Sequence, residues 1–564
     1  MFASGVGRLL PVTRHNHWLI IFLFKYVPLP YSSSSMKQSQ ILVITFLIAA
    51  FTPVNAKSHV SEQPPNILFI AIDDLKPIGS VFAEDPGNFL QRVYPDKKLR
   101  TEVARRMTPN IQRLADKGIT FMNAYCAAPA CNPSRAALMT GIRPHRTGLT
   151  TNAKGTFFRD FEYEGVRPLE NAVTMPEHLR KNGWYTASTG KIYHSTSDYK
   201  LSDGPRSWTD WTNVKGGAGE QTDSIWRTDA LAWGQEGGDM ATYQELNDFR
   251  KADFMARVLE NGEARDGNTT FSINTNQPFF LALGIFRPHL PFFTTKDLID
   301  LFPVEEMSIT RELLEEFIAD GDDVPEAAFS MSGLNRDKTG KAVMGSDRFT
   351  HVLEKGLTQD AKDGDLKAWK DMLMHYFASC AIADRAVGRV LDGLENSPYK
   401  DNTMVILWSD HGYHLGEKLH VSKFAMWDDA AQVNYFIKDL RYPQNAGQRC
   451  YRPVSLIDLY PTVMNLADLD LPSERITGHD ITPLLKNPRA AWKVPTQTTH
   501  GSVNNNMIRS ERHKLIQYKD GSRELYDMKK DPEEFNNLVG KPRHKKVEAQ
   551  METIHNIAIA EGSY

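Results

Sequence analysis

Cysteine is scarce in this chain: four of its 564 residues are Cys, at positions 126, 131, 380 and 450. So few cysteines in so long a chain exclude a fold held together by a disulfide framework. Positive charge is not in excess either, because 66 Lys and Arg face 69 Asp and Glu, giving a net charge of -3. Nucleic-acid-binding proteins show a basic excess, so the composition argues against that class. A few cations gathered in a cleft could still bind a polyanionic substrate.

Apolar runs of transmembrane length are also missing. The run Ile41–Phe51 is too short to span a bilayer comfortably. It follows Met36-Lys37 and precedes Val54-Asn55-Ala56, which is the layout of a secretory signal peptide. We therefore predict a true start at Met36, cleavage after Ala56, and a secreted or periplasmic protein with no stable membrane insertion after cleavage. Alternatively, the apolar patch Trp18–Phe24 in the extension of residues 1–35 is itself a signal or anchor.

The chain does contain a series of short buried-strand patterns. The runs Asn66–Ile72, Pro278–Gly284 and Thr403–Trp408 are apolar on both faces, which is typical of central strands in a parallel sheet. Segments with helical periodicity, such as Trp369–Leu394, alternate with them. This alternation predicts an α/β fold with a mostly parallel central sheet between layers of helices.

The length favours one large α/β unit with a smaller one attached. We predict a signal-bearing extension over residues 1–56, a main domain over 57–490 and a C-terminal α+β subdomain over 491–564. In the subdomain, Met507–Tyr518 and Arg523–Asp527 predict an antiparallel hairpin around a Gly turn, followed by a helix. Residues 195–250 and 300–365 break the main pattern, and we interpret them as loop-like insertions that carry substrate contacts.

Carboxylates follow two of the predicted strands. Asp73 and Asp74 end the first strand, and Asp410 with His411 ends the strand Thr403–Trp408. Open α/β sheets place their sites at these carboxyl ends, and three carboxylates suit Ca²⁺ or Mg²⁺. His411 is either a less typical ligand or a neighbour of the ligands. The competing interpretation of the Asp pair, a turn or helix cap, is less natural at the end of an unbroken apolar strand.

Basic and imidazole side chains follow other predicted strands. Lys191 and His194 are three residues apart and would share one face of a helical turn. The Lys could hold an anionic oxygen while a neutral His takes a proton. His289 lies in Arg287-Pro288-His289-Leu290-Pro291, where two prolines fix the backbone. Each histidine could equally be structural, and Lys423 alone could be a solvated surface lysine.

The pentapeptide Cys131-Asn132-Pro133-Ser134-Arg135 is the most informative motif in the chain. It resembles the signature of the type I sulfatases, in which the Cys is oxidised to formylglycine. The alternative is a buried structural Cys ahead of a helix that opens at Ser134. The order of the other motifs supports the resemblance from about residue 64 to the end: Asp73-Asp74, the Cys motif, Gly190–His194, Pro288-His289, Ser409–Gly412 and Lys423.

Within that family the chain looks most like the iduronate-2-sulfatase branch. The features that point there are Asp410-His411, Pro288–Pro291 and Tyr376–Ser379. Arg287 departs from the pattern of this branch, because relatives often carry Lys there. The guanidinium of an Arg could still bind sulfate or carboxylate through two parallel N–H groups. His414 is a second departure, so the identity of the substrate does not carry over.

The resemblance implies the alkaline phosphatase-like α/β/α fold and the activity of a sulfuric ester hydrolase. It implies that a maturation enzyme oxidises Cys131 to formylglycine. It also implies one divalent cation, Ca²⁺ rather than Mg²⁺, with the ligands Asp73, Asp74, Cys131, Asp410 and His411.

Roles for the remaining residues follow from the same resemblance and from the chemistry of each side chain. Arg135 neutralises charge near the nucleophile. Lys191 and Lys423 bind sulfate oxygens. His289, with Lys423, protonates the leaving sugar oxygen, and His194 deprotonates the second hydroxyl of the aldehyde hydrate so that sulfate leaves. The implied substrate-binding set is Lys191, His289, Lys423 and Arg287.

The expected substrate is a sulfated polysaccharide or oligosaccharide attacked at a chain end, with a 2-O-sulfated uronic acid or a related sugar as one candidate. A phosphonate or phosphate monoester hydrolase of the same superfamily is the alternative enzyme. A non-catalytic glycan-binding relative is the alternative from another class. Such a relative should have lost site residues, whereas every expected position is filled here.

Overall fold

The computed structural model describes residues 64–152, 169, 172–194, 203–214, 222–227, 232–236, 242–274, 276–332, 335–336, 342–343, 366–473 and 475–561. The predictions for residues 1–56, and parts of those for 195–250 and 300–365, lie outside these residues. In the described part of the chain, no helix is both long and apolar enough to cross a membrane.

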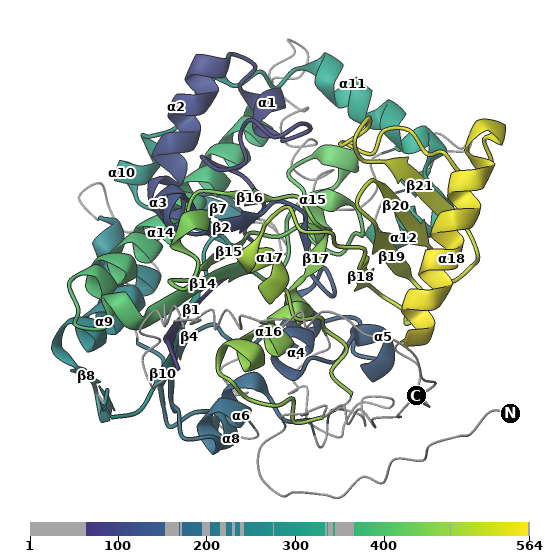
Figure 1. Cartoon of the computed structure of the whole chain (residues 1–564). Coiled ribbons are helices and arrows are strands. Elements are labelled where there is room, and N and C mark those ends of the chain that lie inside the picture. The colour runs from purple at the N-terminus through teal and green to yellow at the C-terminus, as the bar shows by residue number, and fades with distance from the viewer. Residues whose placement is uncertain are drawn as a thin grey trace, which may run out of the picture. The chain divides into compact units, whose positions relative to one another are not determined.

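An eight-stranded sheet forms the centre of the described fold (Figure 1). Its strands, in spatial order, are β16 (Arg449–Cys450), β2 (Ile119–Phe121), β15 (Tyr435–Lys438), β14 (Thr403–Ser409), β1 (Asn66–Ile72), β10 (Phe279–Ile285), β4 (Tyr185–Gly190) and β5 (Asp210–Thr212). The pairs from β14 to β5 are parallel, and β15 is antiparallel to both of its neighbours. The predicted mostly parallel sheet is therefore confirmed.

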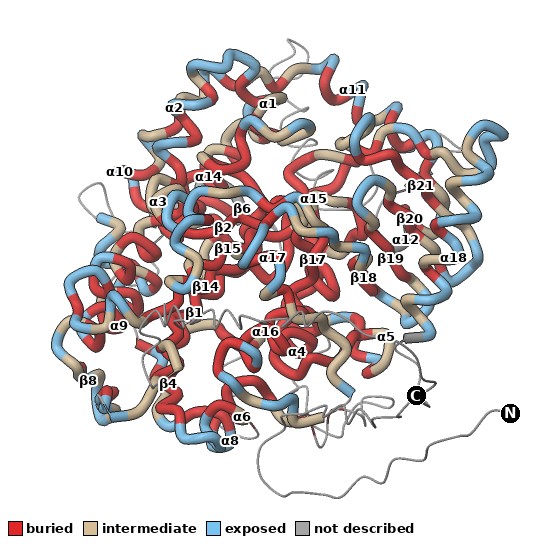
Figure 2. Tube along the Cα trace, in the orientation of Figure 1, coloured by how far each residue is buried: buried red, intermediate tan, exposed pale blue. Residues whose placement is uncertain are grey.

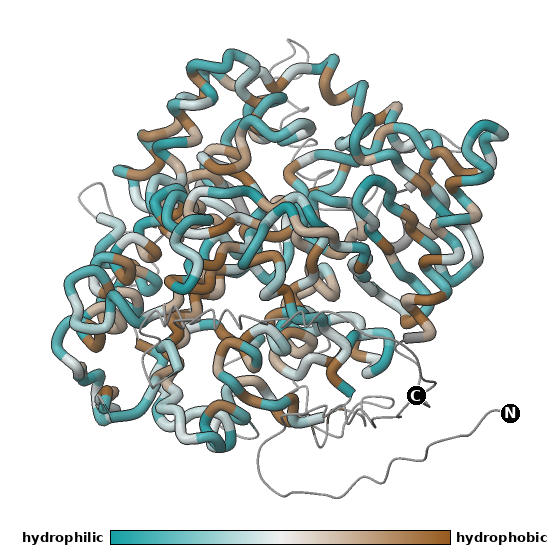
Figure 3. Tube along the Cα trace, in the orientation of Figure 1, coloured by the Kyte–Doolittle hydropathy of each residue, from teal (hydrophilic) through white to brown (hydrophobic). Residues whose placement is uncertain are grey.

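Helices cover both faces of this sheet. Leu68, Ile70 and Ile72 of β1 join one core, whereas Ile67 and Phe69 join the other, because side chains alternate along a strand. The first core is shared with α2 (Lys97–Met107), α3 (Pro109–Lys117), α9 (Asn247–Asn261) and α14 (Lys367–Glu395). The second is shared with α4 (Cys131–Thr140), α6 (Met175–Lys181), α16 (Leu459–Leu466) and α17 (Thr482–Lys486). Burial on both faces explains why these strands read as unbroken apolar runs, and Figures 2 and 3 show β1 and β14 as buried and hydrophobic.

A second, antiparallel sheet lies near the C-terminus. Its strands are β18 (Thr496–Thr499), β19 (Asn506–Arg509), β20 (His513–Gln517) and β21 (Arg523–Asp527). Helix α18 (Lys545–Glu561) packs on it, and Met551 shares a small core with Ile508, Leu515 and Leu525. This arrangement confirms the predicted C-terminal α+β part of the fold.

The remaining described elements are short. The other strands are β3 (Ala124–Tyr125), β6 (Thr222–Arg227), β7 (Ala232–Glu236), β8 (Glu263–Asp266), β9 (Thr269–Ser272), β11 (Phe292–Thr294), β12 (Asn335–Arg336), β13 (Ala342–Val343) and β17 (Val454–Ser455). The other α-helices are α1 (Leu90–Val93), α5 (Pro144–Thr147), α8 (Gly204–Ser207), α10 (Lys296–Ile299), α11 (Arg311–Asp320), α12 (Glu326–Ser332) and α15 (Asp428–Ala431).

Three local predictions differ from the structure. The segment from residue 300 was expected to be loop-like, but it contains α11 and α12. The stretch Met507–Tyr518 is two strands rather than one, because Ser510–Arg512 form a turn in which the Ser510 N–H donates to the His513 carbonyl. The helix expected to open at Ser134 begins three residues earlier, at Cys131.

Candidate active site

The carboxyl ends of adjacent strands bring the predicted site residues together. In the register of the sheet, Ile72 of β1 is level with Ser409 of β14 on one side and Ile285 of β10 on the other. The residues that follow these strands, Asp73, Asp410 and Phe286, therefore leave the sheet side by side. Lys191 follows β4, the next strand along. The sheet thus gathers at one edge groups that are far apart in sequence.

The backbone at Asp74 is held in a conformation that L-residues rarely adopt. Its φ is 59°, in the left-handed region. Its N–H donates to Asp410 Oδ1 at 3.1 Å, and the Tyr376 hydroxyl donates to its carbonyl at 2.9 Å. The same hydroxyl accepts from the Lys76 N–H at 3.0 Å. A strained residue fixed from several sides is a common feature of functional sites.

Cys131 is the first residue of α4, and all ten residues of this helix are buried. Pro133 is accommodated because the first N–H groups of a helix have no partner within the helix. The Ser134 hydroxyl donates to the Asp410 carbonyl at 2.6 Å, so Ser134 ties α4 to the end of β14 instead of opening the helix. Cys131 therefore lies at the positive end of the helix dipole, which favours negative charge there.

Cys131 is surrounded by cations. Its Sγ lies 2.9 Å from Lys423 Nζ and 3.4 Å from His411 Nε2. Burial alone would raise the pKa of the Cys131 thiol, but the surrounding groups outweigh it and hold this pKa well below its usual value. Those groups are Lys423, Lys191 and His411, with a hydrogen bond to His194. The site is thus suited to a negatively charged group at position 131.

Buried ion pairs connect the cations to the carboxylates. Arg135 donates from Nε to Asp410 Oδ2 at 2.9 Å and from Nη2 to Asp73 Oδ1 at 3.0 Å. Lys191 forms an ion pair with Asp73, and Lys423 Nζ lies 2.7 Å from Asp74 Oδ1. Burial would raise the pKa of Asp73, but Lys191 and other nearby cations hold it well below its usual range.

Five side chains form a cluster that fits a divalent cation. The ligand atoms of Asp73, Asp74, Cys131, Asp410 and His411 all lie within 4.8 Å of one another, and all five residues are buried. Burial raises the pKa of Asp410 to about 8. The carboxylates of Asp410 and Asp74 raise the pKa of His411 to about 9 although burial opposes them. The three carboxylates offer the oxygen ligands that hard divalent cations prefer, and the Cys131 sulfur and the His411 nitrogen are the two other ligand atoms of the set.

Three predicted residues lie around this cluster. His194 hydrogen-bonds to Cys131 and is partly exposed. His289 is partly exposed as well, and its ring packs against that of Phe286 with centroids 4.7 Å apart. The Nε of Arg287 donates to the Phe293 carbonyl at 3.0 Å, which ties the loop after β10 to strand β11. Sequence reasoning missed the hydrogen bonds of Tyr376 and Ser134, because neither side chain differs locally from an ordinary helix residue.

All four cysteines are free and buried. Cys380 lies inside α14 and belongs to the buried core. The absence of a disulfide agrees with the argument from composition.

Comparison with known proteins decides the family. The sulfatase family pattern matches residues 65–469, which include every residue of the cluster. The chain belongs to the sulfatase family. As a sulfatase it is a sulfuric ester hydrolase. A second pattern, the C-terminal part of N-sulphoglucosamine sulphohydrolase, matches residues 416–558.

Individual sulfatases show the same relationship along most of the chain. A sulfatase of Formosa agariphila is 30% identical over 499 residues, which cover 87% of each chain. Iduronate 2-sulfatase of Mus musculus is 26% identical over 454 residues, covering 74% of this chain and 71% of its own. The likeness to iduronate 2-sulfatases predicted from sequence is therefore present.

Solved structures confirm the alkaline phosphatase-like fold. A protein in complex with its substrate D-glucosamine-2-N,6-O-disulfate matches with a TM-score of 0.58 at 23% identity, covering 89% of this chain and 99% of that one. The phosphonate monoester hydrolase of Agrobacterium radiobacter matches with a TM-score of 0.59 at 18% identity, covering 88% and 96%. At such identities the likeness shows the fold alone.

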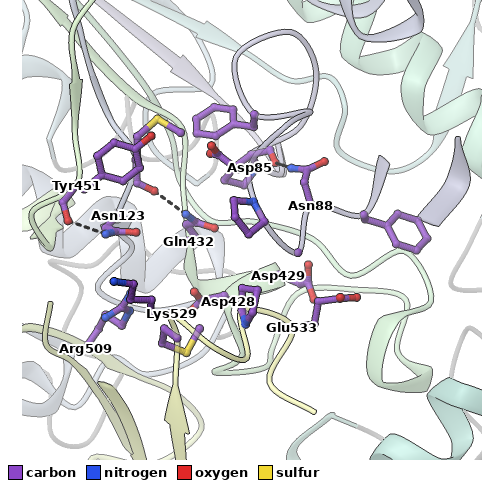
Figure 4. Close-up of a pocket in the computed structure, with 18 of the residues that line it drawn as sticks. Asp85, Asn88, Asn123, Asp428, Asp429, Gln432, Tyr451, Arg509, Lys529 and Glu533 are labelled. Carbon is purple, nitrogen blue, oxygen red and sulfur yellow. Dashed lines mark hydrogen bonds between the residues drawn. The ribbon is translucent and has the colours of Figure 1, made fainter. Parts of the chain in front are cut away.

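A cavity of about 880 Å³ lies between the loop after β1 and the C-terminal sheet (Figure 4). Its lining includes five acidic side chains and four basic ones. The acidic side chains are Asp85, Asp428, Asp429, Glu511 and Glu533, and the basic ones are Lys76, Arg509, Arg512 and Lys529. No residue of the Cys131 cluster lines it, and its walls lack the excess of positive charge that an anionic ester requires.

Proposed function

We propose that this sulfatase hydrolyses sulfate esters on a sulfated sugar, with Cys131 oxidised to formylglycine as the nucleophile. The single observation that carries the proposal is the position of Cys131. It lies at the start of α4, 2.9 Å from a lysine ammonium and inside the carboxylate–histidine cluster. A structural Cys needs neither the ammonium nor the cluster.

In this proposal, side chains of the protein neutralise the charge of the sulfate group and transfer the protons. A bound divalent cation would lower the charge repulsion between the nucleophile and the sulfate ester. Lys191 and Lys423 bind the sulfate oxygens and stabilise the charge that develops on them. Arg135 keeps the buried carboxylates of Asp73 and Asp410 neutralised and in place.

Two proton transfers complete the reaction. One hydroxyl of the formylglycine hydrate, having lost its proton to solvent, would attack sulfur; deprotonation of the second hydroxyl would then break the bond between the hydrate carbon and the ester oxygen and release sulfate. His289, with Lys423, gives a proton to the sugar oxygen as the sulfur–oxygen bond breaks. His194, which contacts position 131, takes the proton of the second hydroxyl. The aldehyde is thereby restored, and water adds to it to regenerate the hydrate.

A sulfated glycan is the substrate class that the relatives support. The solved structure with glucosamine disulfate and the iduronate 2-sulfatase both have sulfated sugars in their names. We propose removal of sulfate at a chain end, with a 2-O-sulfated uronic acid or a related sugar as a candidate. We further propose that the enzyme is secreted or periplasmic and that a formylglycine-generating enzyme matures it.

The mass of the tryptic peptide Gly118–Arg135 tests the nucleophile. We expect the mass change for conversion of one Cys to formylglycine. Cys126 lies in the same peptide and serves as an internal control, because it should stay alkylatable. Active enzyme with both cysteines unmodified would overturn the proposal. The variant Cys131→Ala should lose turnover while remaining folded, since Ala adds no atom to the buried site.

Substrate assays distinguish the proposal from a phosphonate or phosphate monoester hydrolase. The fold is compatible with that activity, as the Agrobacterium radiobacter enzyme shows. We expect faster turnover of an aryl sulfate than of an aryl phosphonate, and sulfate release from sulfated oligosaccharides faster than from the polymer. A preference for the phosphonate would favour the alternative.

A further inference from the structure

The C-terminal sheet packs directly against the segment that leads into Cys131. The Thr498 hydroxyl donates to the Cys126 carbonyl at 2.6 Å, and the Thr499 N–H donates to the Ala127 carbonyl at 2.9 Å. Strand β18 ends at Thr499, so the next residue, His500, leaves the sheet beside the Cys131 loop. The Gly501 N–H then donates to the Thr150 carbonyl at 3.2 Å. These bonds fix the backbone on both sides of His500.

The residue after Lys423 is conformationally strained. Phe424 has a φ of 76°, in the left-handed region that a bulky residue rarely adopts. Its N–H donates to the Pro129 carbonyl at 3.0 Å, two residues before Cys131. The Lys423 carbonyl is also held, because it contacts His420 Nε2 at 2.6 Å. Such strain persists only where the surroundings fix the residue.

One aromatic ring connects these two regions. The Lys423 ammonium lies 5.9 Å from the centroid of the Phe424 ring, within the range of a cation–π contact. The His500 ring stacks on the same Phe424 ring, with centroids 5.7 Å apart and an interplanar angle of 26°. A contact chain therefore runs from the C-terminal sheet through Phe424 to the ammonium that lies 2.9 Å from Cys131 Sγ.

His500 has the properties of an aromatic support rather than of a cation. It is 5% exposed, its Nδ1 has no hydrogen-bond partner, and the ring has a hydrogen bond to the backbone of Thr150. Burial lowers the pKa of His500 to about 4, so the ring is neutral near neutral pH. A neutral ring against Phe424 adds stacking energy without repelling the neighbouring ammonium.

We propose that His500 is a positioning residue of the reaction: its ring clamps Phe424 in the strained conformation and thereby holds Lys423 at Cys131. The inference rests on the proposed role of Lys423 in binding sulfate. It gives the C-terminal subdomain a part in the chemistry without contact to the substrate. The proposal requires the flat ring of His500, not its polar atoms.

Two substitutions distinguish the effect of the His500 ring from the effect of its polar atoms. His500→Phe keeps a ring for stacking, whereas His500→Gln keeps polar atoms and removes the ring. We expect His500→Gln to lower kcat/KM for an aryl sulfate roughly 10- to 100-fold, because small displacements of a catalytic group cost that much. His500→Phe should stay within about threefold of wild type, since it leaves the Lys423 position unchanged.

His555→Ala is the matched control. His555 is also a buried histidine of the C-terminal region, with one ring nitrogen unpartnered, but it lies on α18. It should change the melting temperature without changing kcat/KM. In every variant the fraction of Cys131 converted to formylglycine is measured by mass spectrometry, and rates are normalised to it.

The outcomes separate this inference from the proposed function. Wild-type enzyme that turns over neither aryl sulfate nor sulfated oligosaccharides would overturn the proposed function. Active wild type with His500→Gln equally active would overturn the role of His500. His500→Phe as impaired as His500→Gln would also overturn it, because the ring would then not be what matters. Loss in His500→Gln with rescue in His500→Phe supports it.

Discussion

The guanidinium of Arg135 is 1% exposed and has an oxygen acceptor for each of its nitrogens. Nε and Nη2 reach Asp410 and Asp73, and Nη1 donates to the Ile192 carbonyl at 3.0 Å. Neighbouring carboxylates raise the pKa of Arg135 although burial lowers it, so the group stays charged. The nitrogens of the planar guanidinium lie apart from one another, so this one side chain donates to acceptors that lie on different sides of it.

Arg135→Lys should therefore be far from conservative. A lysine carries all its N–H groups on one nitrogen, so it cannot occupy the positions of both Nε and Nη2, and the buried carboxylates of Asp410 and Asp73 would lose part of their pairing. We expect a loss of about 2–4 kcal/mol in the free energy of unfolding. Urea unfolding followed by circular dichroism measures this loss, and aryl sulfate turnover should fall in parallel.

Arg385→Lys is the comparison variant, because Arg385 also pairs with a buried carboxylate, Asp384, but is 20% exposed. It should lose much less stability. An Arg135→Lys protein with a wild-type unfolding midpoint would show that the guanidinium geometry of Arg135 does not contribute to stability.

The residue types of the site could be predicted from sequence, but most of their pairings could not. Asp73, Asp74 and Asp410 stand out because each follows an unbroken apolar strand. The ion pair of Lys191 with Asp73 depends on β4 lying two strands away from β1, an order that tertiary packing sets. His500 follows a short strand with no motif around it, so no local pattern marks it.

At the level of elements, two glycines allow β4 and β10 to approach closely where the chain turns toward the site. Gly284 of β10 is paired with Gly190 of β4. A Cβ on Gly284 would lie 2.2–2.4 Å from backbone atoms of Lys191, closer than real Cβ contacts. The absence of a side chain at Gly284 thus sets the path that presents Lys191 to Asp73.

Gly284→Ala should displace Lys191 and destabilise the sheet by about 1–3 kcal/mol, the usual cost of overpacking. Aryl sulfate kcat/KM and the melting temperature should both fall. Gly183→Ala is the matched control, because Gly183 has a φ of 87° but open space around it. It should lose stability through backbone strain while kcat/KM stays unchanged. Equal kinetics in the two variants would contradict the prediction.

Elements differ in how well their sequences predict them. Strands β1, β10 and β14 could be placed within a residue or two because both of their faces are buried, and because polar residues mark the ends of β1 and β14. The start of α4 was misplaced because Pro133 suggested a beginning after it, whereas the proline occupies the first turn. The break at Ser510–Arg512 was missed because the polar residues there fit an exposed strand equally well.

For the whole molecule, cation binding should couple to pH. In the metal-free protein His411 has a pKa raised to about 9, so its protonated form contributes stability below its ordinary pKa of 6.5 and this contribution is lost as the pH rises toward 9. The raised pKa of Asp410, about 8, adds a second proton that a cation must displace. Cation and proton therefore compete for one cluster.

We expect the rise in melting temperature caused by Ca²⁺, relative to a chelator, to grow between pH 6.5 and pH 9. Affinity should increase about tenfold per pH unit for each proton displaced. Differential scanning calorimetry at three pH values measures this shift. A shift that is flat or falls with rising pH would show that the cation does not bind at His411 and Asp410.

Cys131 has no exposed surface, and this burial limits the time at which the proposed maturation enzyme can reach its side chain. A separate enzyme cannot reach a side chain enclosed in the folded protein, so the proposed conversion to formylglycine would have to precede folding. His411, which contacts Cys131, is 280 residues further along the chain. At the usual pace of synthesis that interval lasts roughly 15–60 s. Under the proposed maturation, a molecule that folds before oxidation would keep an unconverted thiol at Cys131, which the maturation enzyme could no longer reach.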